Sequence, residues 1–337
     1  MSMKKLFSIM IDKDNNGIHH NIPNARYGKW EINALGFRGK EIHWEKKEGN
    51  IRIVCLGGSE TFGYYESKDK EWPSQLGEML RDQFPKVEVI NASVAGLNFK
   101  KKMDYVKKYV LPLKPDIAII FGQRFLPYAK DSIRRAKGNH LTNEDKRKTL
   151  DKPDNVFIVC GRFLSKLGES IERCFPKQLT THINIWRLRR RIRRKENKHL
   201  INKEPMDELP ESFLLEFETD LISFLNYQKE NHIVPVLSTF PSLITPFNKD
   251  THKNLLLATR LIFGVEFSEN AIIHHLEKRN QIIMRIAKQE NVVFIDIDKL
   301  IPKTLEYFGD NFHYTNKGSE IIAKNIYDIL TRYELIK

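Results

Sequence analysis

Short runs of apolar and β-branched residues recur along the chain. They lie at Ile51–Leu56, Val87–Ile90, Ile117–Phe121, Ile233–Leu237 and Val292–Ile297. None alternates cleanly between apolar and polar residues, which is typical of strands buried on both faces of a parallel sheet. Between the runs, apolar residues recur at helical spacing. The stripes are Phe99, Met103, Val106 and Val110, ended by Pro112 and Pro115; then Phe213, Phe217, Leu221 and Phe224; Ile272, Leu276, Ile283 and Ile286; and Ile321, Ile322, Ile326, Ile329 and Leu330.

This alternation predicts an α/β fold, a doubly wound three-layer α/β/α sandwich with a five-stranded parallel sheet. Two segments fall outside it. Residues 1–50 precede the first strand, and we expect them to form an extended arm. Residues 124–210 separate the third strand from the fourth and are too long for a simple connection, which indicates a mostly helical insertion. The predicted organisation is therefore an arm at 1–50 and a domain at 51–337, interrupted at about 124–210.

Composition and charge narrow the class of protein. The 337 residues carry a formal net charge of +13 and are 41% hydrophobic. These values exclude a disordered chain, a fibrous repeat and an integral membrane protein. Residues 124–204 contain 22 basic and 9 acidic residues, a difference of +13, so the rest of the chain is neutral as a whole. The positive charge therefore belongs to the insertion.

Cysteine spacing and the N-terminus point to a cytoplasmic protein. Cys55, Cys160 and Cys174 are widely spaced, without the pattern of a zinc site, and favour a reducing compartment. The apolar run at 6–11 is too short for a signal peptide, and no later run approaches the length of a membrane span. We expect neither a metal nor an organic cofactor.

Residues with catalytic potential follow the predicted strands. Ser59 comes after two glycines behind the first strand, and Gly96 lies in a turn of small residues after the second. Asp310 and His313 follow the fifth strand after a loop. Because ligands bind outside the carboxyl ends of the strands in open parallel sheets, these residues are expected to meet at one edge.

A serine, a histidine and an aspartate together support nucleophilic catalysis. A serine hydroxyl is a weak nucleophile unless an imidazole takes its proton, and a carboxylate usually fixes the imidazole tautomer. Flanking glycines allow a sharp turn that brings the Ser59 N–H towards a substrate carbonyl. The alternative for Gly57-Gly58-Ser59 alone is a strand-to-helix turn in which Ser59 is a helix cap.

The spacing of these residues departs from α/β-hydrolases proper. Thr61 stands where a GxSxG elbow has its last glycine, and Asp310 precedes His313 by only three residues. A third motif is Gly96 after Asn91-Ala92-Ser93-Val94-Ala95. Together, the motifs at Ser59, at Gly96 and at Asp310 with His313 resemble those of the SGNH (GDSL-type) hydrolases, in the same order. The resemblance implies that Ser59 is the nucleophile, His313 the general base and Asp310 its orienting carboxylate. It also implies that the Ser59 and Gly96 N–H groups donate to the oxyanion.

The resemblance covers roughly residues 30–124 and 220–332. Asn33-Ala34-Leu35-Gly36-Phe37-Arg38-Gly39 is similar to the segment that precedes the first strand in bacterial members. We expect a turn at Gly36–Gly39 that packs the arm against the sheet, with Arg38 in an ion pair. Asn280, on the helix before the last strand, is expected to face solvent.

The third block of the family is altered in this chain. Arg124 stands where the family has an asparagine, and Phe125 where it has an aspartate. Arg124 could donate to the oxyanion or bind an anionic part of the substrate. Alternatively the oxyanion hole is impaired, Gln123 or Asn98 substitutes after a small loop shift, or Arg124 is a solvated loop charge.

The densest charge lies at residues 185–195. Ile185, Leu188 and Ile192 form one apolar stripe on a predicted helix otherwise rich in arginine. The segment could contact an anionic membrane peripherally, or form a lid or packing helix with a solvated basic face. Nucleic acid is disfavoured because neither interleaved aromatic residues nor a known binding motif accompanies the charge.

The sequence thus predicts a serine ester hydrolase that forms an acyl-serine intermediate on O-acyl esters of a carbohydrate or lipid. The basic insertion favours an anionic substrate or surface. Two alternatives stay open: a catalytically impaired SGNH-fold binding or scaffold protein, suggested by Arg124, and an acyltransferase that uses the same triad.

Overall fold

The computed structural model of the chain describes residues 9–97, 99–121, 204–263 and 266–336. The chain divides into two compact units. The larger comprises Ser8–Phe125, Leu215–Leu243 and Lys278–Lys337, and the smaller comprises Met1–Phe7, Leu126–Leu214 and Ile244–Glu277. The predicted arm, as far as it is described, therefore belongs to the larger unit.

The larger unit contains a five-stranded sheet in the order β6-β5-β7-β8-β9. The strands are β5 (Ile51–Leu56), β6 (Val87–Asn91), β7 (Ile117–Ile120), β8 (Val234–Ser238) and β9 (Val293–Ile295). Every neighbouring pair in this sheet is parallel. The predicted fold class is confirmed, and the strand order reverses at β5, as in doubly wound sheets.

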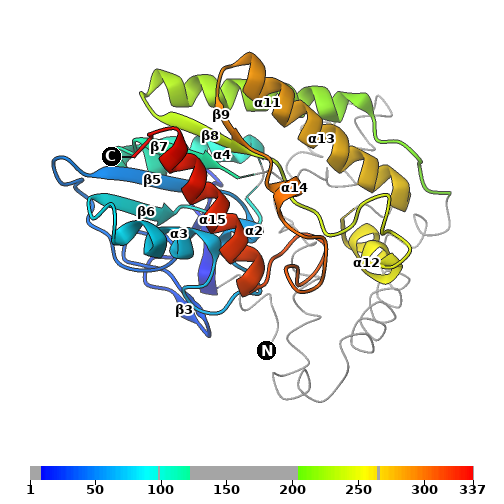
Figure 1. Cartoon of the computed structure of the whole chain (residues 1–337), viewed down its shortest axis with the longest axis horizontal. Helices are drawn as coiled ribbons and strands as arrows, with labels where there is room; N and C mark the ends of the chain where they lie inside the picture. Colours follow the sequence, from blue (N-terminus) through cyan, green and yellow to red (C-terminus); the bar gives the residue numbers. More distant parts are fainter. Residues whose placement is uncertain (1–8, 98, 122–203, 264–265, 337) are drawn as a thin grey trace. The chain divides into compact units, whose positions relative to one another are not determined.

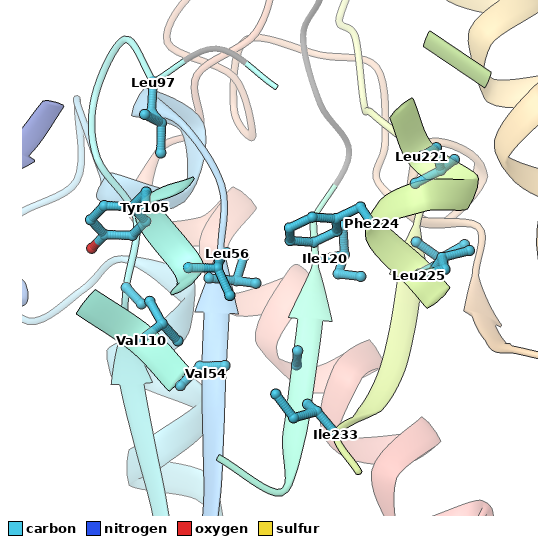
Figure 2. Close-up of a cluster of buried hydrophobic side chains, with 14 of the residues drawn as sticks. Val54, Leu56, Leu97, Tyr105, Val110, Ile120, Leu221, Phe224, Leu225 and Ile233 are labelled. Atoms are coloured by element: carbon cyan, nitrogen blue, oxygen red, sulfur yellow. The ribbon is translucent and has the colours of Figure 1, made fainter. Parts of the chain in front are cut away.

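Helices cover both faces of the sheet (Figure 1). On one face lie α3 (Trp72–Arg81) and α15 (Asn316–Arg332), which pack against each other. On the other face lie α4 (Phe99–Tyr105), α11 (Glu211–Glu230) and α13 (Glu269–Gln289). Figure 2 shows this second interface, where Val54 and Ile120 of the sheet meet Val110, Phe224 and Leu225. Strands buried on both sides explain why the apolar runs do not alternate with polar residues.

Two predicted elements differ from those in the structure. The helix stripe that begins at Phe99 is not one α-helix, because α4 gives way to a π-helix, η1 (Val106–Val110), and a 3-10 turn, η2 (Leu111–Leu113). Proline within η2 has no N–H to continue an α-helical ladder. The fifth strand ends at Ile295, and a short helix, α14 (Ile297–Leu300), takes up the remainder of the apolar run.

Residues 9–50 contain two small antiparallel hairpins. One pairs β1 (Ile11–Lys13) with β2 (His19–Asn21), and the other pairs β3 (Arg26–Tyr27) with β4 (Trp30–Glu31). A turn follows, in which the Asn33 side chain accepts the Leu35 and Phe37 N–H groups. The Asn21 amide donates to Ser93 O at 3.1 Å, which ties this segment to the loop after β6.

In the smaller unit, the described residues form the start of α11, helix α12 (Lys253–Phe263) and the start of α13. Met206 and Ser268 are joined by a backbone hydrogen bond of 2.8 Å. Of the helices that the structure describes, none is long and apolar enough to cross a membrane.

Candidate active site

Ser59 follows the carboxyl end of strand β5, which lies between β6 and β7, and it begins the one-turn helix α2 (Ser59–Phe62). The preceding turn is tight, because a Cβ atom on Gly57 would lie 1.9 Å from Thr61 Oγ1. The Glu60 carboxylate accepts the Gly58 N–H at 2.6 Å and fixes the turn from within. Close packing therefore requires glycine at position 57.

In the structure, His313 and Asp310 lie next to Ser59 in one row of side chains. Ser59 Oγ lies 2.8 Å from His313 Nε2. The opposite ring nitrogen, His313 Nδ1, lies 2.9 Å from Asp310 Oδ1 and 2.8 Å from Asp310 Oδ2. The three side chains thus form a hydrogen-bonded chain in the order serine, histidine, aspartate. This is the arrangement in which an imidazole can take the serine proton while a carboxylate orients it.

Asp310 is an ionised acceptor in this arrangement. Its Oδ1 also accepts the backbone N–H groups of Phe312 and His313, at 2.8 and 2.9 Å. Burial alone would raise the pKa of Asp310, but the electrostatic interaction with His313 and these hydrogen bonds hold the pKa below its usual value. The carboxylate is therefore charged at neutral pH and can stabilise a protonated imidazole.

The loop that carries Asp310 and His313 is fixed by a second loop, which follows β8. Leu243 N–H donates to Asn311 O at 3.0 Å, and Ser242 Oγ donates to Asn311 Oδ1 at 2.9 Å. On the far side, Thr315 caps α15 by accepting the Gly318 N–H. His313 is thus held between a helix start and a buried loop.

Two backbone N–H groups were predicted to donate to the oxyanion, those of Ser59 and Gly96. Among the residues that the structure describes, neither the Ser59 N–H nor the Gly96 N–H has a hydrogen-bond acceptor. Ser59 N–H is also the first amide of α2, and amides at a helix start have no partner within the helix. The Ser59 N–H is therefore available to a substrate oxygen, and the role of the Gly96 N–H stays a prediction.

Two tyrosines that the sequence patterns did not single out pack against the histidine. The ring centre of Tyr64 lies 5.1 Å from that of His313, and Tyr65 meets the imidazole edge-on at 5.8 Å. Both follow α2 directly, so a scan of the positions after Ser59 could have found them. They narrow the space around the imidazole.

The neighbouring Glu66 is fully buried. Its carboxylate accepts Ser319 Oγ at 2.6 Å and Tyr65 N–H at 3.0 Å. Burial raises the pKa of Glu66 to about 7, although the hydrogen bond from Ser319 opposes this change. Glu66 thus joins the loop after α2 to helix α15.

Several predicted site residues lie outside the described part of the chain. These are Asn98, Gln123, Arg124 and the basic segment 185–195. Their contributions to oxyanion, substrate or membrane binding stay predictions. Within the described residues, no cluster of three or more histidine, cysteine, aspartate or glutamate side chains could hold a metal ion.

Arg38 forms the ion pair expected for it, with Glu71 at 3.3 Å. Asn280 was predicted to face solvent, and this prediction is wrong. Its amide donates to Phe240 O at 3.0 Å and accepts the Phe240 N–H at 2.8 Å. Asn280 therefore satisfies both backbone groups of Phe240 in the loop after β8. Helical periodicity cannot reveal this contact, since it depends on a loop 40 residues away.

No family model and no curated protein matches the sequence. Similar solved structures include a lipolytic protein of the G-D-S-L family from Desulfitobacterium hafniense, with 15% identity, 83% of this chain and 100% of that chain covered, and a TM-score of 0.43. A lipase/acylhydrolase from Enterococcus faecalis has 14% identity, with 85% and 97% covered and a TM-score of 0.44. An acetylxylan esterase from Geobacillus stearothermophilus has 12% identity, with 85% and 96% covered and a TM-score of 0.46.

Proposed function

We propose that this chain is a serine ester hydrolase of the SGNH type, with Ser59, His313 and Asp310 as its catalytic triad. The distance of 2.8 Å between Ser59 Oγ and His313 Nε2, with Asp310 on the other ring nitrogen, carries the proposal. A helix-capping role, the alternative considered for Ser59, does not account for it, because the N-cap of α2 is Gly58 and no side-chain hydrogen bond caps the helix. Nor would a capping role account for a histidine oriented by a carboxylate with a lowered pKa.

In the proposed reaction, Ser59 Oγ attacks the ester carbonyl carbon while His313 Nε2 takes the hydroxyl proton. The tetrahedral intermediate collapses, the bond to the leaving alcohol breaks, and His313 returns the proton to that alcohol. Water, activated by the same imidazole, then releases the acid from the acyl-serine. Asp310 stabilises the imidazolium during both steps without taking its proton.

The Ser59 and Gly96 N–H groups are the donors that we assign to the oxyanion. Removal of one such donor typically costs about 100- to 1,000-fold in rate, so two well-placed amides supply much of the catalysis. Arg124, Gln123 or Asn98 would provide a third donor.

For the substrate class, we propose O-acyl esters of a carbohydrate or lipid. The ester bond follows from the triad chemistry, whereas the positive charge at 124–204 supports an anionic substrate or surface. An acceptor alcohol in place of water would turn the same steps into acyl transfer. Product analysis with an added sugar or alcohol separates the two reactions.

The test combines turnover with covalent labelling. We expect the full chain to hydrolyse p-nitrophenyl acetate and to be labelled by a fluorophosphonate at Ser59, as located by peptide mass spectrometry. Ser59→Ala should abolish both. Ser223→Ala, which removes an exposed hydroxyl that donates to Thr219 O within α11, should change neither.

Absence of both turnover and labelling in the wild-type chain would refute the hydrolase and favour a binding role. Labelling at a serine other than Ser59 would refute the proposed nucleophile.

A further inference from the structure

Helix α2, which presents Ser59, has only four residues. A helix of this length is not stable by itself, and its last carbonyl groups need partners from elsewhere. It ends at Gly63, whose left-handed backbone (φ 85°) lets its N–H donate to Ser59 O at 3.2 Å. The position of Ser59 therefore depends on the groups that hold Gly63.

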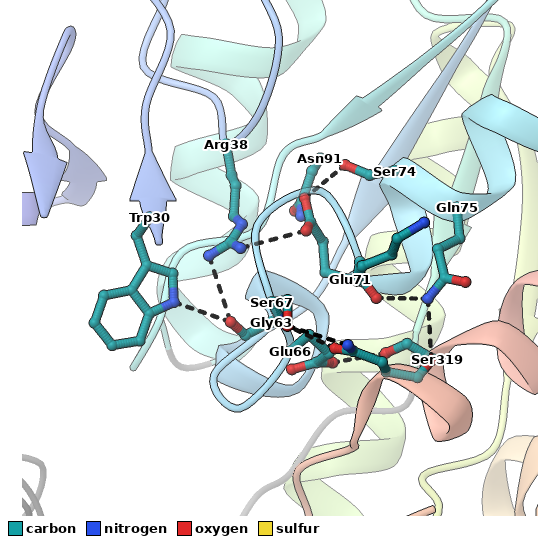
Figure 3. Close-up of polar contacts among 12 residues, drawn as sticks. Trp30, Arg38, Gly63, Glu66, Ser67, Glu71, Ser74, Gln75, Asn91 and Ser319 are labelled. Carbon is teal, nitrogen blue, oxygen red and sulfur yellow. Dashed lines mark hydrogen bonds and ion pairs between the residues drawn. The ribbon is translucent and has the colours of Figure 1, made fainter. Parts of the chain in front are cut away.

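Two side chains from the N-terminal segment bind the same atom of Gly63 (Figure 3). Trp30 Nε1 donates to Gly63 O at 3.0 Å, and the Arg38 guanidinium donates to it at 3.4 Å. The guanidinium carbon also lies 4.9 Å from the ring centre of Phe62, the last residue of α2. The end of the helix is thus held from outside by segments that precede β5.

Arg38 is itself fixed in place. Its side chain is 2% exposed and lies 3.3 Å from the fully buried Glu71. Ser74 Oγ donates to the other oxygen of Glu71 at 2.6 Å, and the Arg38 N–H donates to Asn91 O at 3.3 Å. Burial of an ion pair costs about as much as the attraction returns, so stability alone is a weak explanation for this pair. An apolar pair of equal volume could not donate to Gly63 O.

We propose that Arg38 is a positioning residue for Ser59. Held by Glu71, its guanidinium fixes the Gly63 carbonyl together with Trp30 and keeps the Ser59 hydroxyl within reach of His313 Nε2. The inference rests on the proposed serine mechanism. Lysine cannot replace Arg38, because a single ammonium lacks the planar fork that binds a carboxylate and a carbonyl at once.

The experiment measures the rate constant for fluorophosphonate labelling of Ser59 in the folded fraction of each variant. Arg38→Lys should lower it at least about tenfold, since a misplacement of about 1 Å costs up to about 100-fold. Trp30→Phe retains an aromatic ring and removes one donor, so it should lower the rate constant a few-fold. Ester turnover should fall through kcat more than through KM in both variants.

Arg52→Lys is the matched control. Arg52 is also fully buried and ion-paired, with Glu88 at 2.8 Å, and it donates to Leu113 O at 2.7 Å. It stands at the start of β5, whereas Ser59 follows the other end of that strand. Arg52→Lys should lower the Tm at least as much as Arg38→Lys, with an unchanged labelling rate constant in the folded fraction.

The inference would be overturned if folded Arg38→Lys and Trp30→Phe were both labelled with the wild-type rate constant. An equal loss in Arg52→Lys would also overturn it, because the effect would then be one of stability. If Arg38→Lys does not fold, Trp30→Phe alone decides. A wild-type chain that is not labelled overturns the serine mechanism and this inference together, which distinguishes that failure from a failure of Arg38 alone.

Discussion

Replacement of Asp310 by asparagine tests the proposed mechanism most directly. Among the described residues, Asp310 Oδ1 accepts three groups, the Phe312 and His313 N–H groups and His313 Nδ1, whereas Oδ2 faces His313 Nδ1 alone, at 2.8 Å. An asparagine must keep its oxygen at the Oδ1 position, since an amide NH2 there would oppose two backbone donors. The NH2 group then occupies the Oδ2 position and faces His313 Nδ1.

That placement reverses the imidazole tautomer. Because the amide donates, His313 Nδ1 must accept, and the ring proton moves to Nε2. Nε2–H then points at Ser59 Oγ and cannot take its proton. A triad held in the wrong tautomer loses about 10⁴-fold in kcat, which corresponds to about 5.5 kcal/mol of barrier.

Steady-state hydrolysis of p-nitrophenyl acetate and fluorophosphonate labelling of Ser59 measure the loss. The Tm should change little, because the oxygen of asparagine still accepts both backbone N–H groups. Asp298→Asn is the matched control, since Asp298 follows the last strand and accepts the Ser242 N–H at 3.1 Å without touching the triad. A kcat for Asp310→Asn within tenfold of the wild-type value would refute the assigned order of hydrogen bonds.

Three further changes have expected outcomes. The pKa of Glu66 is about 7 in the folded chain, against a usual value of 4.5. Between these two pH values the folded chain keeps the Glu66 proton, whereas the unfolded chain has lost it. The contribution of Glu66 to stability therefore falls as pH rises through this range. Glu66→Gln should therefore raise the free energy of unfolding at pH 8 by up to about 3 kcal/mol and leave it nearly unchanged near pH 4, as measured by urea titration. Gly57→Ala forces a Cβ atom to within 1.9 Å of Thr61 Oγ1, and should cost about 1–3 kcal/mol and most of the activity. Asn280→Ala leaves the N–H and C=O of Phe240 without partners and should cost about 2 kcal/mol in urea unfolding, whereas a cost below about 0.5 kcal/mol would contradict the importance of this contact.

The sheet could be predicted from the sequence because its signal is local. Each buried strand needs a run of apolar residues, and the runs at β5 and β7 match the structure to within one residue. The boundary of β9 was wrong by two residues, since apolar residues in α14 continue the same run without remaining extended. The π-helical turn η1 also escaped prediction, because its apolar spacing is compatible with an α-helix.

The triad could be assembled from sequence by a different kind of inference. Residues that follow parallel strands must gather at one edge of the sheet, so Ser59, Asp310 and His313 could be expected together although Ser59 and His313 are 254 positions apart. The rule places the residues at the same edge. It does not give the orientation of the imidazole or the identity of its hydrogen-bond partners.

Sequence by itself therefore determined the layers of this protein and the residue types at the edge that holds the candidate site, because burial and strand direction leave periodic, local traces. Only the tertiary structure decided which contacts hold these layers and residues in place. Three sets of contacts join segments that share no common period. Trp30 and Arg38 both donate to Gly63 O, Asn280 pairs with Phe240, and the buried Glu66 joins the loop after α2 to α15. Such contacts are set by the packing of the whole chain, and side-chain hydrogen bonds over long sequence separations leave no pattern along it.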